Sequence, residues 1–216
     1  MTLLCTALLS LSLGAQDLTI LHINDTHSHI DPQRAGDYKG RGGVIEQAAF
    51  IDSVRTAVGK RNVLLLHAGD YGQGTSYFTE LGGNIEIDVM NAMKFDVTCL
   101  GNHEFDNGVD ELARRLKNLK ADVVCANYDF TGTPCEGIVK PWTVIKRKGV
   151  RIGVFALSPD PAGLIARDYC KGVKFISPVD AAKTAVAELK AQGCDVIICL
   201  SHLGWKIPNE YNDERL

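Results

Sequence analysis

The sequence predicts an α/β fold with a mainly parallel sheet, and three observations support this prediction. Apolar runs of strand length alternate with segments of helical periodicity, which is typical of a parallel sheet. Chemically active polar residues follow several of these runs, at the strand ends where open α/β sheets place their ligands. The chain has 216 residues, 45% hydrophobic and 23% charged, which is enough for one sizeable core. No linker divides it, so we expect one domain over residues 16–216.

The strands are predicted from short apolar runs that end in polar residues or glycine. Residues 63–68 form a continuous apolar run, as expected of a strand that is covered on both faces. Residues 143–146 and 150–157 resemble a hairpin that turns around Lys148 and adds antiparallel strands. The predicted strands are residues 18–23, 63–68, 96–100, 121–126, 143–146, 150–157 and 196–200.

The helices are predicted from apolar positions three and four residues apart. Residues 44–58 show this spacing most clearly and indicate a helix with one buried face. Asn84 and Ser177 are the predicted N-caps of two other helices, because their side chains can accept a hydrogen bond from the first turn. The predicted helices are residues 44–58, 84–93, 109–119 and 178–192.

The first fifteen residues resemble a secretory signal peptide. Residues 1–15 are apolar and uncharged, and they end in small residues before Gln16. They lack the usual basic start, and the alternative interpretation is a buried N-terminal helix. The run is too short, and too closely followed by Asp17, to predict a stable membrane span. The sequence therefore predicts an exported protein, in the periplasm, at the cell surface or outside the cell.

Charge and cysteine content exclude some kinds of partner and site. The formal net charge of −3 and the pI of about 6.1 predict no broad cationic surface for a nucleic acid polymer or an anionic lipid. The densest basic run, residues 146–148, is interpreted as a solvated hairpin tip. No Cys-x-x-Cys pair supports a zinc ribbon. Cys99, Cys125 and Cys199 are predicted to be small core residues, whereas a Cys135–Cys170 disulfide is left open.

The segment from Leu100 to Asp106 has the highest density of reactive groups. A glycine at 101 allows a sharp turn and a close approach to a ligand, and an amide, an imidazole and two carboxylates follow it. The alternative interpretation is a polar turn with a helix N-cap. Its place after a predicted strand favours a functional loop.

Several strand ends carry metal-type ligands that a parallel sheet would bring into one cleft. Oxygen and imidazole ligands without thiolates suit Zn, Mn, Fe or a similar divalent ion. We expect Asp25 and His27 to hold one ion, because alternate residues of an extended chain point the same way. Asn102 and His202 would hold a second ion, and Asp70 would bridge the two with its two oxygens.

Such a pair of ions suits attack of an activated water or hydroxide on phosphorus. His103 is the predicted catalytic imidazole, since it adjoins a ligand and can protonate a leaving oxygen. Asp106 is predicted to orient that imidazole and raise its basicity.

Other polar residues receive structural interpretations. His22 and His67 lie inside predicted strands and are expected to be core histidines or to support a ligand. His29 is expected to be a loop residue, and Asn127 to lie next to the ligands. Glu104 is expected to cap or buttress the following helix rather than act as a base.

Four motifs in this order resemble the calcineurin-like metallophosphoesterases, and most closely their 5'-nucleotidase branch. The motifs are Asn24-Asp25-x-His27, Gly69-Asp70, Gly101-Asn102-His103-Glu104-Phe105-Asp106 and Ser201-His202-x-Gly204. The resemblance covers residues 18–204 and implies a four-layer sandwich of two sheets between helices, with a dinuclear site at the sheet edge. It also implies metal roles for Asp25, His27, Asp70, Asn102 and His202, and a catalytic pair of His103 with Asp106.

The chain departs from that family in one respect. The family's further Gly-His-x-His or Gly-His-x-Gln motif is absent after His202, as is the C-terminal domain that stacks on the nucleobase. We therefore expect a piece of a longer protein, one that by itself binds metal weakly and selects nucleobases poorly.

The predicted function is metal-dependent release of phosphate from nucleotides. The alternatives are a 2',3'-cyclic nucleotide phosphodiesterase, a sulfur-ester hydrolase on the same scaffold, or a non-catalytic surface protein that uses the fold for binding. Thiosulfonate and nucleotide substrates would separate the enzymes. Intact His103 and Asp106 argue against the non-catalytic alternative. The sequence leaves the base, the native metal and the oligomeric state open.

Overall fold

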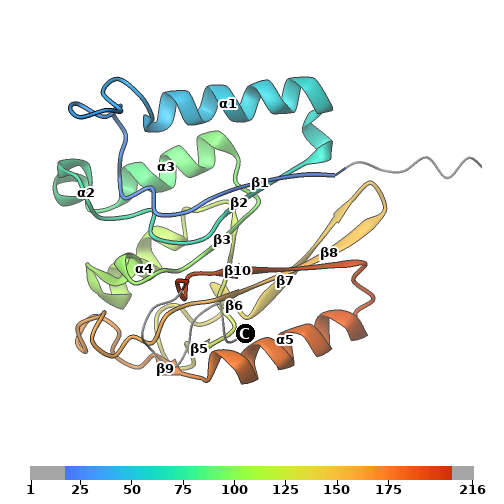
Figure 1. The fold of residues 1–216 in the computed structure, drawn as a ribbon. Helices are drawn as coiled ribbons and strands as arrows, with labels where there is room; N and C mark the ends of the chain where they lie inside the picture. The colour runs from blue at the N-terminus through green and yellow to red at the C-terminus, as the bar shows by residue number, and fades with distance from the viewer. Residues whose placement is uncertain (1–17, 206–216) are drawn as a thin grey trace, which may run out of the picture.

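A computed structural model describes residues 18–205, which form two facing sheets with helices on their outer sides (Figure 1). The larger sheet has five parallel strands in the order β1-β2-β3-β4-β6. Its strands are β1 (Thr19–Ile23), β2 (Val63–His67), β3 (Val97–Cys99), β4 (Asp122–Val124) and β6 (Val139–Lys140). The predicted parallel sheet is therefore confirmed.

The second sheet contains the predicted hairpin. It has the order β10-β8-β7, with β7 and β8 antiparallel and β8 and β10 parallel. Its strands are β7 (Trp142–Arg147), β8 (Val150–Leu157) and β10 (Val196–Ser201). A separate pair, β5 (Tyr128–Asp129) and β9 (Lys174–Phe175), is antiparallel.

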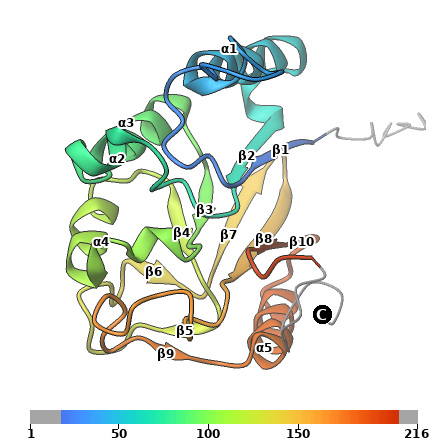
Figure 2. The same ribbon diagram turned by 60° about the vertical axis from the view of Figure 1, so that its left-hand side comes forward.

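Helices cover the outer face of each sheet, as both views show (Figures 1 and 2). The helices are α1 (Gly43–Val58), α2 (Ser76–Leu81), α3 (Asn84–Met93), α4 (Gly108–Leu116) and α5 (Pro178–Ala191), with 3-10 turns η1 (Lys60–Asn62) and η2 (His103–Phe105). Ile51 of α1 and Met90 of α3 pack with Leu65 of β2. Ala185 of α5 packs with Leu157 of β8. The layers therefore run helix, sheet, sheet, helix.

The alternation of side chains along β2 explains how it joins two layers. All five residues of β2 are buried. Leu64 and Leu66 face the second sheet and pack with Ile152 and Val154 of β8, whereas Leu65 faces the helices. A strand covered on both faces is expected to be mostly apolar, as the run from Val63 to Leu66 is.

A side-chain bridge joins the two sheets at their carboxyl ends. The buried Asn127 amide donates to the Ser158 carbonyl at 2.7 Å and accepts from the Ser158 backbone N–H at 2.8 Å. The Ser158 hydroxyl donates to the Leu100 carbonyl at 2.5 Å. Because Leu100 follows β3 and Ser158 follows β8, the bridge sets the spacing of the two strand ends. Asn127 thus links the sheets.

The helix prediction is confirmed for four helices, with differences at their ends. Ser177 caps α5 as predicted, its hydroxyl accepting from the Asp180 N–H at 3.4 Å. Asn84 is not the cap of α3: Gly83 takes that position, and the Asn84 side chain donates to the Leu81 carbonyl instead. The short helix α2 lies where the sequence predicts a loop.

Two burial predictions are wrong for the same reason. His22 and Cys199 are exposed, although both lie in apolar runs. Each sits on a strand at the edge of its sheet, β1 or β10, which has a neighbouring strand on one side only among the described residues. Cys99 and Cys125 are buried as predicted. Cys135 and Cys170 are not joined by a disulfide.

The predicted signal peptide, residues 1–15, lies outside the described residues. Within residues 18–205, no helix is both long and apolar enough to cross a membrane.

Candidate metal centre

The loop after β1 lies against the loop after β2. The backbone N–H groups of Asp25, His27 and Ser28 donate to the carbonyls of residues 69, 70 and 71, at 3.0 to 3.1 Å. Asp25, His27, Ser28 and Asp70 all have positive φ, between 45° and 55°. Left-handed backbone at non-glycine residues costs free energy, and such residues cluster at ligand sites. The strain therefore marks these two loops as candidates for function.

Asp25, His27 and Asp70 come together as predicted. Their ligand atoms all lie within 4.8 Å of one another. His27 Nε2 is 3.5 Å from Asp25 Oδ1 and 3.9 Å from Asp70 Oδ2. Neither carboxylate has a Lys or Arg ion pair among the described residues. Two negative charges are thus held close together, and the only ionisable basic groups that face them among the described residues are imidazoles.

His202 reaches the same cluster from the second sheet. Its Nε2 is 3.1 Å from Asp70 Oδ2, and its Nδ1 contacts the Ala68 carbonyl at 2.7 Å, which fixes the proton on Nδ1. Burial opposes the imidazolium, but the hydrogen bond and negative charge of Asp70 outweigh it and raise the pKa of His202 to about 9. His202 also holds the pKa of Asp70 below its ordinary value, against the effect of burial. Asp70 is therefore the central anion of the cluster.

Glycine at 101 allows this contact between the two sheets. A Cβ atom at that position would overlap Asp70 Oδ1 and lie 2.7 Å from His202 Nε2. At Gly69, which has a φ of 92°, a Cβ would lie 2.9 Å from His202 Nδ1. No side chain fits in either place, so the glycines are required by close approach.

Asn102 and His103 begin the turn η2 beside these groups. The His103 backbone N–H donates to Asp70 Oδ1 at 2.9 Å, and its ring lies 5.3 Å from the His27 ring. His103 Nδ1 is 2.8 Å from Asp106 Oδ2, the pairing that the sequence predicts. Asn102 is half-buried, and no hydrogen bond among the described residues joins its side chain to Asp70 or His202. The structure thus places four predicted ligands in contact and Asn102 next to them.

The donor set fits a divalent cation. Carboxylates and imidazoles without thiolates are the ligands expected for Zn, Mn or Fe, and a cation would neutralise Asp25 and Asp70. His27 Nδ1 is buried without a hydrogen-bond partner among the described residues. Asp25, His27, Asp70 and His202 are the residues that would bind the metal.

Comparison with known proteins agrees with this geometry. Residues 18–216 match the family model described as calcineurin-like phosphoesterase. The chain belongs to this family.

Several relatives of this phosphoesterase chain are named as 5'-nucleotidases. A Treponema pallidum protein named "Probable 5'-nucleotidase" is 37% identical over 200 residues, which are 89% of this chain and 34% of that protein. The NAD 5'-nucleotidase of Haemophilus influenzae is 35% identical, over 88% of this chain and 32% of that protein. The crystal structure of the 5'-nucleotidase precursor from Thermus thermophilus matches with a TM-score of 0.77 at 35% identity, over 87% of this chain and 37% of that one. This chain spans about a third of the length of these relatives.

Glu104 has a different role in this phosphoesterase from the one that the sequence predicts. It is fully buried, and its carboxylate accepts backbone N–H groups of Asp70, Tyr71, Gly72 and Gly101 at 2.5 to 3.3 Å. It therefore ties the loop after β2 to the loop after β3, and does not cap α4. Burial and the negative charge of Asp70 raise the pKa of Glu104, against the N–H donors. Only tertiary structure could reveal this role.

A second buried carboxylate near the site is not predicted from the sequence. Glu86, in the first turn of α3, accepts a hydrogen bond from the Ser28 hydroxyl, next to His27. Glu86 is 3% exposed, so it anchors the ligand loop from the helix layer. An acidic residue in the first turn of a helix is ordinarily interpreted as a favourable interaction with the helix dipole, which conceals this contact.

The remaining histidines lie largely where they are expected. His67 is buried, its Nδ1 accepts from the Gly69 N–H at 3.2 Å and its Nε2 contacts the Thr26 hydroxyl at 3.1 Å. It is thus a core histidine beside the ligand loops. His29 is an exposed loop residue, as predicted, with Nδ1 3.0 Å from the His27 carbonyl.

Proposed function

We propose that this chain carries the metal-dependent active site of a phosphohydrolase that releases phosphate from nucleotides. The observation that carries the proposal is the His103–Asp106 pair beside the cluster of Asp25, His27, Asp70 and His202. The family is that of phosphoesterases, and the relatives are named as nucleotidases. A nucleotide is therefore the proposed substrate class.

The proposed ligand roles divide between two ions, with His202 as the ligand from the second sheet. Asp25 and His27 would hold one divalent ion, His202 and Asn102 the other, and Asp70 would be a ligand shared by both. Two such ions would polarise the phosphoryl group and lower the pKa of an attacking water molecule. The buried Asp70, fixed by the His103 N–H and by His202, supplies a rigid anchor for this arrangement.

His103 and Asp106 would handle the proton of the leaving group. Asp106 engages Nδ1 of His103, which leaves Nε2 free to donate to the leaving oxygen. The carboxylate fixes the orientation of the ring, so that Nε2 faces away from Asp106. Both side chains are about one-third exposed, at 32% and 34%, so a substrate can reach them.

The apolar segment at residues 1–15 supports the further proposal that the protein is exported. The site would then act on nucleotides outside the cytoplasm.

The test is the variant His103→Asn, made in this chain and in any longer protein that contains it. Release of phosphate from a nucleotide panel with Mn or Zn should fall at least about a hundredfold, because the proton donor is lost. Metal content, measured by plasma mass spectrometry, should stay nearly unchanged. His22→Asn, an exposed histidine on β1, is the matched control and should retain both properties.

Two results would contradict these assignments. Loss of metal in His103→Asn would make His103 a ligand. If no nucleotide released phosphate and a chelator changed nothing, the proposed activity would be wrong. Including 2',3'-cyclic nucleotides and thiosulfonates in the panel separates the other hydrolases on this scaffold.

A further inference from the structure

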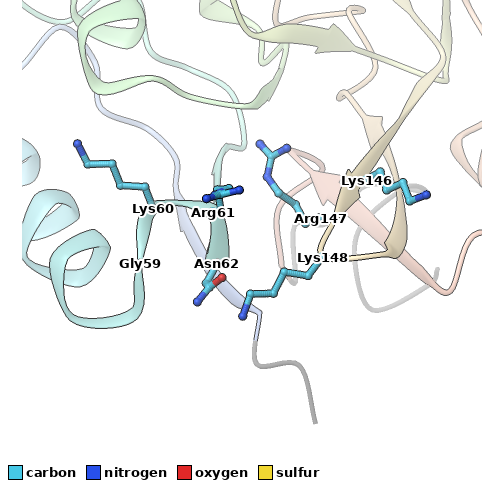
Figure 3. A pocket seen from close by; sticks show the side chains of 7 residues that line it. All are labelled: Gly59, Lys60, Arg61, Asn62, Lys146, Arg147 and Lys148. Carbon is cyan, nitrogen blue, oxygen red and sulfur yellow. The ribbon is translucent and has the colours of Figure 1, made fainter. Parts of the chain in front are cut away.

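Two loops that are far apart in the sequence meet at the end of the molecule opposite the metal centre. They enclose a pocket of about 880 Å³ (Figure 3). One loop joins α1 to β2, and the other is the tip of the β7–β8 hairpin. The lining residues are Gly59, Lys60, Arg61, Asn62, Lys146, Arg147 and Lys148.

Five of the seven lining residues are cationic, although the whole chain has a net charge of −3. Arg147 forms an ion pair with Asp96. The other four are exposed, and none of them forms an ion pair with any residue that the structure describes. These are Lys60, Arg61, Lys146 and Lys148. The pocket is therefore a local concentration of uncompensated positive charge.

The backbone holds these cations in place. α1 ends at Val58, the φ of 86° at Gly59 turns the chain into η1, and the first buried residue of β2 follows at Val63. The hairpin turns at Lys148 and Gly149, both with positive φ, as a two-residue hairpin turn requires. Both loops are short and begin or end at paired strands, so the separation of the two groups of cations is fixed by the sheets.

Like charges held close together repel, and a bound anion relieves that repulsion. Lysine provides a compact charge and arginine a planar fork of donors, and both suit phosphate oxygens. A single phosphate would contact only part of a pocket of this volume, whereas several linked or adjacent phosphates could contact both loops.

The pocket is separate from the metal centre. Asn62 precedes β2 and Asp70 follows it, and five strand residues span roughly 16 Å. A ligand here is therefore a second ligand, and its binding does not depend on the proposed hydrolysis.

We propose that this pocket binds an anion that carries several phosphate groups. Such groups occur free, in a polyphosphorylated molecule, or side by side in the headgroups of an anionic phospholipid surface. The same side chains would bind the phosphates of a free molecule and those of lipid headgroups. Lys60 and Arg61 would contact the anion from one loop, and Lys146 and Lys148 from the other.

The test uses the full 216-residue chain in buffer with a chelator, so that metal-dependent binding is suppressed. Inorganic triphosphate is titrated by calorimetry, and sedimentation is measured with vesicles of phosphatidylcholine alone or mixed with phosphatidylglycerol. We expect at least one of these anionic probes to bind, and affinity to fall at least about tenfold between roughly 50 and 300 mM salt. Backbone amide NMR shifts should change at residues 60–62 and 146–149.

The matched variants are two double charge reversals. Lys60→Glu with Arg61→Glu should weaken binding by about tenfold or more. Lys183→Glu with Lys190→Glu, on exposed sites of α5, changes the net charge equally and should alter binding less than about twofold. Circular dichroism checks that each variant is folded, and the NMR map on the unaltered chain gives a measurement that needs no variant.

The outcomes distinguish a free polyphosphorylated molecule from an anionic phospholipid surface. Binding of triphosphate without vesicles identifies a free polyphosphorylated ligand, and binding of anionic vesicles alone identifies a lipid surface; both support the proposal. The proposal is overturned if neither probe binds, if the control reversal weakens binding equally, or if the shifts occur at the metal-centre loops.

Discussion

The two ends of the sheets differ in how their polar groups are held. At the carboxyl end, charged side chains are buried and mutually bonded: Glu104 accepts several backbone N–H groups, and Asp70 meets His202. At the amino end, Lys60 and Lys148 are exposed and lie on ordinary short connections. The first end needs every partner to keep its geometry, whereas the second keeps its geometry through the strands alone. Substitutions should therefore be costly at one end and tolerated at the other.

The largest expected effect is that of Glu104→Gln. The amide group would replace one carboxylate oxygen and face backbone N–H donors that it cannot accept from, leaving buried donors unpaired. We expect a loss of about 3 kcal/mol in the free energy of unfolding, measured by urea denaturation. Asp195→Asn is the amino-end control, because Asp195 is exposed and, among the described residues, its side chain accepts only the Arg151 N–H. A similar loss in both variants would remove the contrast between the ends.

The second prediction concerns the pH dependence of stability in the metal-free chain. Burial lowers the pKa of His67 from 6.5 to about 3. Below pH 6.5 the unfolded state gains a proton that the folded state does not, so stability should fall as pH drops from 6.5 toward 3. The free energy of unfolding should have fallen by roughly 2 kcal/mol at about pH 5.

His202 should produce the opposite slope. Asp70 raises the pKa of His202 to about 9. The charged imidazole therefore contributes fully to the free energy of unfolding below pH 6.5, and this contribution is lost as pH rises through 9. His67→Gln should flatten the acid side of the stability profile and His202→Gln the alkaline side. A profile unchanged by both substitutions would show that neither histidine controls it.

The last prediction concerns Gly101→Ala, which should lower the free energy of unfolding by about 1 to 3 kcal/mol and weaken metal binding at least about tenfold. The new Cβ would displace Asp70 and His202 from each other. Gly149→Ala at the hairpin tip is the control, because its Cβ would meet no atom within 4 Å and only the positive φ opposes it. Equal metal affinity in both variants, measured by titration calorimetry, would contradict the role assigned to Gly101.

The sequence predicts this fold well wherever a single strand or helix is long and periodic. The run from Val63 to His67 and the spacing along α1 depend only on which faces are buried, and that pattern is visible in one dimension. It does not show which strand lies at a sheet edge, so it predicts burial for His22 and Cys199, which are exposed. It also misses strands of two residues, such as β6, which are too short to show alternation.

The candidate site is predicted from strand ends, and the parts that escape prediction depend on contacts between layers. Asp25, Asp70 and His202 each follow a strand, so their convergence can be expected from the sheet alone. Glu104 and Glu86 act through backbone and hydroxyl groups of other loops, and no local spacing encodes those partners. The positive φ of Asp25 and Asp70 is likewise set by the tertiary hydrogen bonds around them.

The bridge of Asn127 and Ser158 has a consequence for how the metal centre fills. Its buried hydrogen bonds fix the carboxyl ends of β3 and β8 relative to each other. They therefore also fix the distance between the cluster of Asp25, His27 and Asp70 on the larger sheet and His202 on the second sheet. The ligand side chains thus lose most of their conformational entropy when the chain folds, and little of it when an ion binds. A cation entering the cleft meets a preorganised cage, so ion exchange should proceed without opening the two sheets.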